Sequence, residues 1–354
     1  MRKTARIISL LLVLLLLLAG CGGTENPPSS SAAAPSGSSA GGSATTAPSQ
    51  GEQSGILTEE QVGKKKVAML VKNQLGFFWI EVAEYAKVKA EEYGWDIEIL
   101  SPIASDNNEE QIQLLENALI NPPDIFIIAP SDSAGIAPAI EAINKAGVPI
   151  INLNTRIFGD NIEYVTYISV ENYNMGHDLI TNAINAIGET GKAVIIEGKT
   201  GSQTYMDRDK GGRDAFAEHA GWEIIDSQVA NGNRAEALSV TQNLLTKHPE
   251  IDMIYSQSGE MALGVIEAIT QAGRKEISVV CVNAFPEICD AISEGRILMA
   301  MDDAGYVQGP ISLEYAMKYF QGYEMEKDVW MEAIFVDKNN VQEYHDRYKE
   351  EYGQ

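Results

Sequence analysis

The chain has 354 residues, of which 45% are hydrophobic, and its 50 Asp and Glu against 26 Lys and Arg give a formal net charge of −24. Such an acidic chain argues against nucleic acid or an anionic lipid surface as a partner, because like charges repel. Once the atypical N-terminal segments are set aside, about 300 residues remain, which is enough for two domains.

The N-terminus has the pattern of a secretory signal. Cations within the first six residues precede an almost wholly aliphatic run over residues 7–18. This run is short for a membrane span of roughly 20 residues, and it fits the apolar region of a signal peptide. The letters LAGC follow and look like a bacterial lipobox, so we expect a signal peptide over residues 1–20 and a lipid on Cys21. An ordinary signal peptide with a chance cysteine and a single transmembrane anchor are the alternatives.

A low-complexity segment follows the lipobox. Residues 22 to about 55 are mostly Ser, Ala, Gly, Pro and Thr. Such a segment cannot bury enough apolar surface to offset the entropy lost on ordering. We therefore predict a disordered tether over residues 22–63 that holds the folded part off the cell membrane, outside the cytoplasm.

From Lys66 onward, short apolar runs alternate with amphipathic stretches. The runs predict strands at residues 67–71, 95–100, 125–129, 149–153, 193–197, 222–229, 253–255, 277–282 and 298–301. The amphipathic stretches predict helices at residues 77–93, 108–120, 136–146, 175–187, 211–219, 235–247, 260–271, 286–293 and 308–320. Apolar strands without alternation are buried on both faces, as in parallel sheets covered by helices. The pattern predicts an α/β fold with two doubly wound parallel-sheet lobes.

Polar residues directly follow several of these strands, and open parallel sheets bind ligands at the carboxyl ends of their strands. Amides and guanidinium groups can each form two hydrogen bonds with neighbouring hydroxyls. The candidates chosen on this ground are Asn154, Arg156, Arg208, Ser258, Asn283 and Asp303.

Three adjacent aromatic residues, Phe77, Phe78 and Trp79, begin the first helix of the pattern. They cannot all face the same core, so at least one should point into a cleft and stack on the apolar face of a sugar ring. A polar cleft with an aromatic wall suits a polyhydroxylated solute.

Four motifs carry a resemblance to a known family: GFF at residues 76–78, VPIINLNTR at 148–156, DRDKG at 207–211 followed by DAF, and QNLLTKHPEIDMIYSQSGEMALGVIEAI at 242–269. On these motifs, residues 66 to 335 resemble type I periplasmic sugar-binding proteins, the ribose-binding protein group. The resemblance implies two lobes joined by about three crossing segments and closed by ligand like a hinge. The lobes would comprise residues 64–169 with 304–328, and residues 170–303 with 329–354.

The resemblance also implies roles for individual residues. Phe77 and Phe78 match aromatics that sandwich the sugar ring, Arg208 matches a ligand-binding Arg, and Asn154 matches an Asp that accepts from sugar hydroxyls. Ser258, Asn283 and Asp303 match polar positions of the family. Thr155 replaces a frequent Arg, for which the neighbouring Arg156 is the candidate substitute. The chain departs from the family pattern where Asn154 and Asn283 replace carboxylates and where Gly232 replaces a frequent aromatic. Family specificity for ribose or galactose is therefore not carried over, and a polyol, an amino sugar or another polar solute stays open.

Cys281 and Cys289 lie in SVVCVNAFPEIC, whose spacing fits neither a CxxC motif nor a metal site. Two buried thiols and a disulfide both stay open. The sequence predicts no metal and no cofactor.

The expected function is capture of a monosaccharide or polyol by an extracellular lipoprotein, a monomer, which delivers it to an ABC-type permease and its ATPase. The alternative is a sensing lipoprotein that presents its closed form to a sensor kinase or chemoreceptor. An enzyme is not expected, because none of the four histidines has metal-site spacing. No GxSxG nucleophile elbow appears either, since the letters GSSAG at residues 37–41 lie in the low-complexity segment. A DNA-binding regulator is excluded by the lipobox and tether at its N-terminus.

Overall fold

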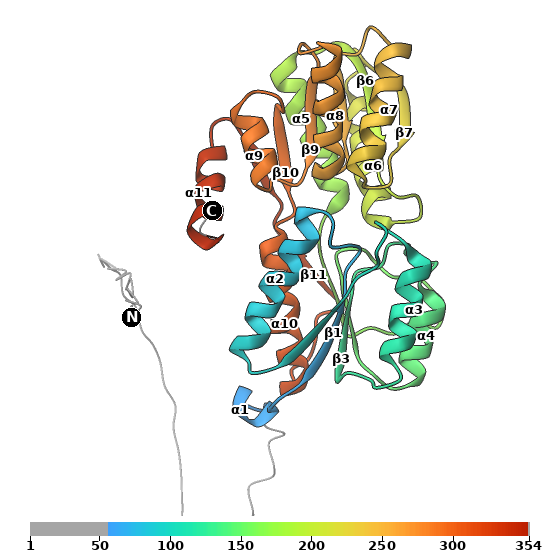
Figure 1. The fold of residues 1–354 in the computed structure, drawn as a ribbon, viewed down its shortest axis with the longest axis vertical. Coiled ribbons are helices and arrows are strands. Elements are labelled where there is room, and N and C mark those ends of the chain that lie inside the picture. Colours follow the sequence, from blue (N-terminus) through green and yellow to red (C-terminus); the bar gives the residue numbers. More distant parts are fainter. Residues whose placement is uncertain (1–55, 353–354) are drawn as a thin grey trace, which may run out of the picture. The chain divides into compact units, whose positions relative to one another are not determined.

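The computed structural model describes residues 56–352 and the side chains up to Arg347 (Figure 1). The predicted signal peptide, Cys21 and residues 22–55 of the predicted tether lie outside this part of the chain. None of the described helices is long and apolar enough to cross a membrane.

The first lobe is built on a six-stranded sheet in the order β11-β5-β4-β3-β1-β2. Every neighbouring pair is parallel. The strands are β1 (Lys66–Leu70), β2 (Asp96–Leu100), β3 (Ile125–Ile128), β4 (Ile150–Leu153), β5 (Thr166–Val170) and β11 (Asp328–Met331).

The second lobe has a sheet of the same size in the order β12-β10-β9-β8-β6-β7. All pairs are parallel except β10 with β12. The strands are β6 (Gly191–Glu197), β7 (Trp222–Val229), β8 (Met253–Ser256), β9 (Ser278–Val282), β10 (Met299–Asp302) and β12 (Ile334–Asp337).

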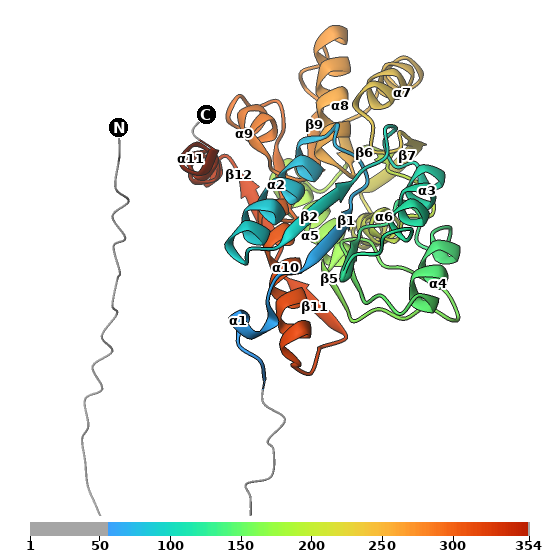
Figure 2. The ribbon, with the colours of Figure 1, turned by 60° about the horizontal axis from the view of Figure 1, so that its bottom comes forward.

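Helices cover both faces of each sheet (Figures 1 and 2). In the first lobe, α2 (Phe77–Glu92) and α10 (Gly305–Gln321) pack on one face, and α3 (Asn108–Ala118) and α4 (Ala137–Lys145) on the other. In the second lobe, one face carries α5 (Asn172–Ile187) and α6 (Gln203–Glu218), and the opposite face carries α7 (Arg234–Lys247), α8 (Gly259–Ala272) and α9 (Pro286–Ser293). The predicted α/β class with two doubly wound parallel-sheet lobes is confirmed.

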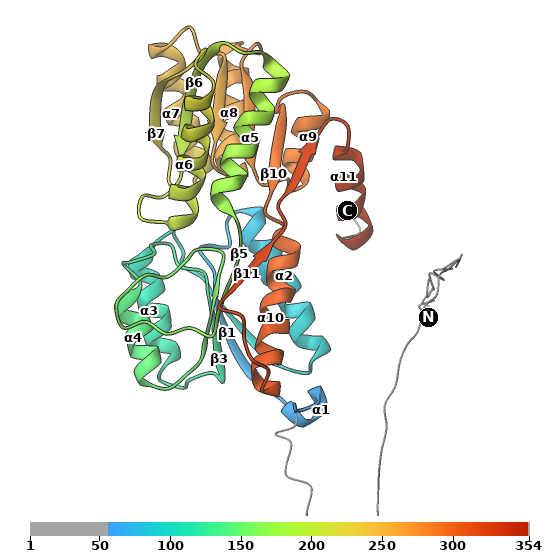
Figure 3. The ribbon, with the colours of Figure 1, turned by 180° about the vertical axis from the view of Figure 1, so that it is seen from behind.

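Three segments of the described chain cross between the lobes, after β5, after β10 and after β11 (Figure 3). The prediction that residues from 329 onward belong to the second lobe is wrong for β11, which pairs with β5 of the first sheet. The letters DVWM form a short edge strand with only three apolar residues in succession, and the sequence pattern therefore predicted no strand there.

The N-terminal helix α1 (Glu59–Val62) overlaps the predicted tether. The Thr58 side chain accepts from the Gln61 N–H, and the Gln61 side chain accepts from the Thr58 N–H, which together form a capping box. Val62 is buried in the core of the first lobe. The prediction of disorder up to residue 63 is therefore wrong from Thr58 onward.

The helix α6 begins at Gln203, about two turns before the expected start at residue 211. Its polar first turns, QTYMDRDK, have no apolar stripe to reveal them. Arg208 consequently lies on a helix and not in the glycine-rich loop that the sequence suggested.

Glycines let α5 and α6 approach closely enough to hold Arg208 in place. A Cβ on Gly176 would lie 2.2 Å from the backbone oxygen of Arg208, and a Cβ on Gly211 would lie 2.0 Å from the backbone oxygen of Tyr173. Both clashes are with backbone, so the helices could only accommodate a side chain by moving apart.

We expect Gly211→Ala to lower the free energy of unfolding by about 1–3 kcal/mol, because it overpacks the contact between α5 and α6. Chemical denaturation measures this change. The neighbouring exposed substitution Lys210→Ala serves as the control and should change the free energy of unfolding by less than about 1 kcal/mol. Equal stability of Gly211→Ala and the wild type would contradict the close packing.

Candidate functional site

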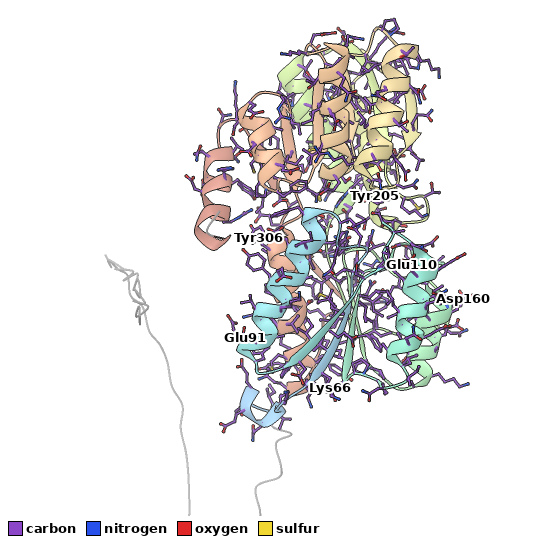
Figure 4. All side chains as sticks on the ribbon, viewed as in Figure 1. Lys66, Glu91, Glu110, Asp160, Tyr205 and Tyr306 are labelled. Carbon is purple, nitrogen blue, oxygen red and sulfur yellow. The ribbon has the colours of Figure 1, made fainter. Side chains whose placement is uncertain are left out.

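A cavity of about 360 Å³ lies between the two lobes, within the size range of small-molecule sites. Figure 4 labels Tyr205 where the lobes meet. Both lobes and the segment after β10 line the cavity. The first lobe contributes Lys72, Asn73, Leu75, Gly76, Phe78, Trp79, Ser105, Asp106 and Asn154. The second lobe contributes Thr204, Tyr205, Arg208, Gly232, Asn233, Arg234, Ala235, Ser258, Glu260 and Asn283, and the segment after β10 contributes Asp303.

The structure brings six of the eight residues predicted from the sequence together around this cavity. They are Phe78, Asn154, Arg208, Ser258, Asn283 and Asp303. Four of these, Asn154, Ser258, Asn283 and Asp303, follow a strand or cap a helix, as expected for parallel sheets that bind ligands at the carboxyl ends of their strands.

Phe77 does not line the cavity, so this part of the prediction is wrong. Its ring stacks on Phe285 with centroids 5.4 Å apart and packs against the core of the second lobe. The next two aromatic residues, Phe78 and Trp79, line the cavity instead. Consecutive helical residues point in directions about 100° apart, so adjacency in GFF does not imply a shared direction.

Arg156 also lies outside the cavity, contrary to the prediction. Its guanidinium pairs with Asp328 at 3.0 Å and lies 4.1 Å from the centre of the Tyr167 ring. All three residues belong to the first lobe, where Asp328 is on the edge strand β11. Arg156 therefore stabilises an edge of the sheet and does not replace the arginine absent at Thr155.

A buried network organises the floor of the cavity. Arg208 donates from Nε to Asn172 Oδ1 at 2.8 Å, from Nη1 to the Gln257 backbone oxygen at 3.2 Å and from Nη2 to Asp303 Oδ2 at 2.7 Å. Asn283 Nδ2 donates to the other oxygen of Asp303 at 2.6 Å. A guanidinium has five N–H groups, so two remain for a ligand after these three contacts.

The network extends into the hinge and the first lobe. Gln308, on α10, donates to the Asp303 backbone oxygen at 2.7 Å and accepts from Asn154 Nδ2 at 3.1 Å. Ala304, between them, has a left-handed backbone with φ 51°. A displacement of Asp303 by ligand would therefore act directly on a crossing segment.

The lobes also contact each other around the cavity rim. Phe77 N–H donates to Glu260 Oε1 at 2.9 Å, and the hydroxyls of Thr155 and Thr204 share a hydrogen bond of 2.7 Å. Ser133 adds a further link, because its Oγ accepts from the Gln203 N–H at 3.0 Å. These contacts hold the lobes together around the cavity in this structure.

Sequence reasoning missed Lys72 although it directly follows the strand predicted at residues 67–71 and lies two residues after the end of β1. Its side chain is only 2% exposed and donates to Ser202 Oγ at 3.1 Å. Burial lowers the pKa of Lys72 to about 8. The rule that selected the other strand-end residues could have found it, but a lysine after a strand is ordinarily a surface residue.

Asp106 and Tyr205 were also missed. Asp106 lies in the loop between β2 and α3, and Tyr205 lies on the unexpected first turn of α6. Burial raises the pKa of both side chains. Neither residue directly follows a strand, and no sequence signal pointed to them.

Tyr205 explains why Gly232 stands where the family often has an aromatic. A Cβ on Gly232 would lie 2.9 Å from the Tyr205 hydroxyl and 3.0 Å from Asp106 Oδ2, and φ at Gly232 is +69°. Tyr205 thus occupies the space that a side chain at residue 232 would need.

The cysteines Cys281 and Cys289 are both free and buried. Their thiols donate to the backbone oxygens of Asn283 at 3.8 Å and Ala284 at 3.0 Å. Of the two alternatives left by the sequence, the structure has the buried thiols.

We expect Asp303→Asn to lower the free energy of unfolding by about 3–5 kcal/mol, because it leaves the buried Arg208 guanidinium without its counter-charge. Thermal and chemical unfolding measure this loss. Glu84→Gln removes a carboxylate from the exposed pair with Lys87, and this control should cost at most about 1 kcal/mol. Equal losses in the two variants would show that the buried pair does not stabilise the fold.

Comparison with known proteins agrees with the geometry. The family described as "Periplasmic binding protein domain" matches residues 67–324. The ribose import binding protein of Escherichia coli K12 is 25% identical over 77% of this chain and 90% of its own length. The D-ribose/D-allose-binding protein of Pseudomonas aeruginosa PAO1 is 26% identical over 75% of this chain and 86% of its own length.

Solved structures give the same result. An ABC transporter periplasmic solute binding protein from Actinobacillus succinogenes 130z with bound D-allose is 29% identical, with a TM-score of 0.74 over 79% of this chain and 99% of that chain. A solute binding protein from Bacillus halodurans C-125 with bound myo-inositol is 25% identical, with a TM-score of 0.74 over 81% and 99%. The resemblance to the type I group is confirmed, and the chain belongs to the periplasmic binding protein family.

Proposed function

We propose that this protein captures a small uncharged polyhydroxylated solute, a monosaccharide or polyol, in the cavity between its lobes and delivers it to an ABC-type permease and its ATPase. The observation that carries the proposal is the buried Arg208–Asp303–Asn283 network beside the aromatic wall of Phe78 and Trp79. Aromatic faces suit the C–H face of a sugar ring, and fixed polar groups suit its hydroxyls.

The charges around the cavity favour an uncharged solute. Three cationic side chains line it, and so do three carboxylates: Lys72, Arg208 and Arg234 against Asp106, Glu260 and Asp303. A hydroxyl can both donate and accept, so it can meet either kind of group without disturbing this balance. The matched relatives include proteins named for ribose and allose and a structure with bound myo-inositol, which supports the same ligand class.

The proposed location is the outer face of the cell membrane. Its support is the signal-peptide pattern over residues 1–20 and the LAGC lipobox, which would place a lipid on Cys21. We propose that the protein acts as a monomer and a binding protein, not an enzyme, because the relatives it matches are solute-binding proteins.

A ligand panel tests the proposed function by thermal unfolding of the protein without its signal peptide and with Cys21→Ser. A solute at about 1,000 times its Kd adds roughly 4 kcal/mol of stability, which should raise Tm by about 8–16 °C. The panel contains D-ribose, D-allose, D-galactose and myo-inositol.

Two cationic positions provide matched variants for the panel. Arg156→Ala lies outside the cavity and should keep the full shift, whereas Lys72→Met removes a lining group and should lose most of it. No shift for any solute with the wild type would overturn the proposed function.

Binding of the best solute in the panel should weaken above pH 8. Lys72 is protonated below its pKa of about 8, and above it the side chain loses the ammonium that donates hydrogen bonds in the cavity. We therefore expect the Kd to rise about tenfold between pH 7 and pH 9. Calorimetric titration measures it, with Lys72→Met expected to bind weakly and without this pH dependence. An unchanged wild-type Kd up to pH 9 would rule out a role for charged Lys72.

A further inference from the structure

Asp106 carries a polar atom that the folded chain does not satisfy. The residue is 2% exposed and lines the cavity. Its Oδ1 is buried and accepts no hydrogen bond from any described residue. The nearest cation, Lys72 Nζ, lies 3.9 Å from this oxygen, beyond hydrogen-bond distance. Buried carboxylate oxygens are normally hydrogen-bonded, so this one requires an explanation.

The corresponding loop of the next βα unit shows what a structural carboxylate looks like in this lobe. Asp132 follows β3, and its Oδ1 accepts from the N–H groups of Ala134 and Gly135 at 3.1 and 2.7 Å. Asp132 is thus satisfied by its own loop. Asp106 differs because its Oδ1 accepts no such hydrogen bond from its loop. Its backbone N–H donates to the Lys72 backbone oxygen at 3.3 Å.

Gly232 of the second lobe leaves room beside the Asp106 carboxylate. The point where a Cβ on Gly232 would lie is 3.0 Å from Asp106 Oδ2, so glycine at this position keeps a side chain away from it. Both Gly232 and Asp106 line the same cavity.

We propose that Asp106 Oδ1 accepts a hydrogen bond from a ligand hydroxyl and that the neighbouring Lys72 makes this position select a hydroxyl over an amino group. Asp106 is then a specificity-determining residue. The inference rests on the proposed function and narrows its ligand class to uncharged sugars and polyols, against the amino sugars that the sequence left open.

The selection follows from the charges. A ligand ammonium bound to Oδ1 would lie close to the Lys72 ammonium, which is 3.9 Å from the same oxygen. Two like charges in a buried site repel strongly, because little solvent screens them. A hydroxyl can donate to Asp106 and accept from Lys72 at once, so one neutral group satisfies both side chains.

The test is a double-mutant cycle between Asp106 and the ligand. Calorimetry measures the Kd of the best-binding member of the panel, and of its monodeoxy and monoamino analogues, for the wild type, Asp106→Asn and Asp124→Asn. Asp124 is the matched control, since it accepts a backbone hydrogen bond from Lys66 and does not line the cavity.

We expect Asp106→Asn to weaken binding by about 10–100-fold, the value of a hydrogen bond to a charged group, and Asp124→Asn to leave it unchanged. For one monodeoxy analogue, removal of the hydroxyl should weaken binding to the wild type. The same removal should not weaken binding to Asp106→Asn, relative to that variant's Kd for the parent solute. The amino analogue at that same position should bind the wild type at least tenfold more weakly than the parent solute.

The outcomes separate this inference from the proposed function. If the wild type binds no member of the panel, both fall. If it binds but Asp106→Asn stays within twofold, or if every deoxy analogue loses equally with both proteins, only the role of Asp106 falls. Tight wild-type binding of all amino analogues overturns the selection, and this arm needs no variant to fold.

Discussion

The buried ion pair between Arg208 and Asp303, 2.7 Å apart, is the interaction on which the rest of the site depends. A buried charge is tolerated only with a partner and further hydrogen bonds, and here Asn172, Gln257 and Asn283 supply them. Arg208 lies on α6 and Asp303 in a crossing segment. The close packing of α5 on α6 and the path of the hinge are therefore both constrained by the same pair.

This constraint links the cavity to motion of the lobes. Asp303 contacts the second lobe through its carboxylate and the first lobe through its backbone oxygen, which accepts from Gln308. A ligand that uses the free N–H groups of Arg208 would bind on one side of a junction that already joins both lobes. Ligand affinity and closure are coupled to the extent that these contacts differ between open and closed forms.

The sequence predicted the sheets and several site residues because strand ends converge in a parallel sheet. That rule identified Asn154, Asn283 and Asp303, and it applied equally to Lys72, which was passed over. The rule does not predict the direction in which a side chain points. It therefore could not show that Phe77 stacks on Phe285 and does not line the cavity. Residues supplied by a loop or by a polar helical turn, such as Asp106 and Tyr205, leave no periodic signal. Short edge strands such as β11 were missed for the same reason.

Charge shows how far composition can mislead about a binding site. The whole chain carries a formal net charge of −24, yet the cationic and acidic side chains that line the cavity are equal in number. The acidic excess therefore belongs to the outside of the folded part, where it bears on solubility and on which surfaces the protein avoids. The ligand meets a different environment, in which Arg208 is buried beside Asp303 and Lys72 beside Asp106. A neutral solute with many hydroxyls leaves this balance of charge intact.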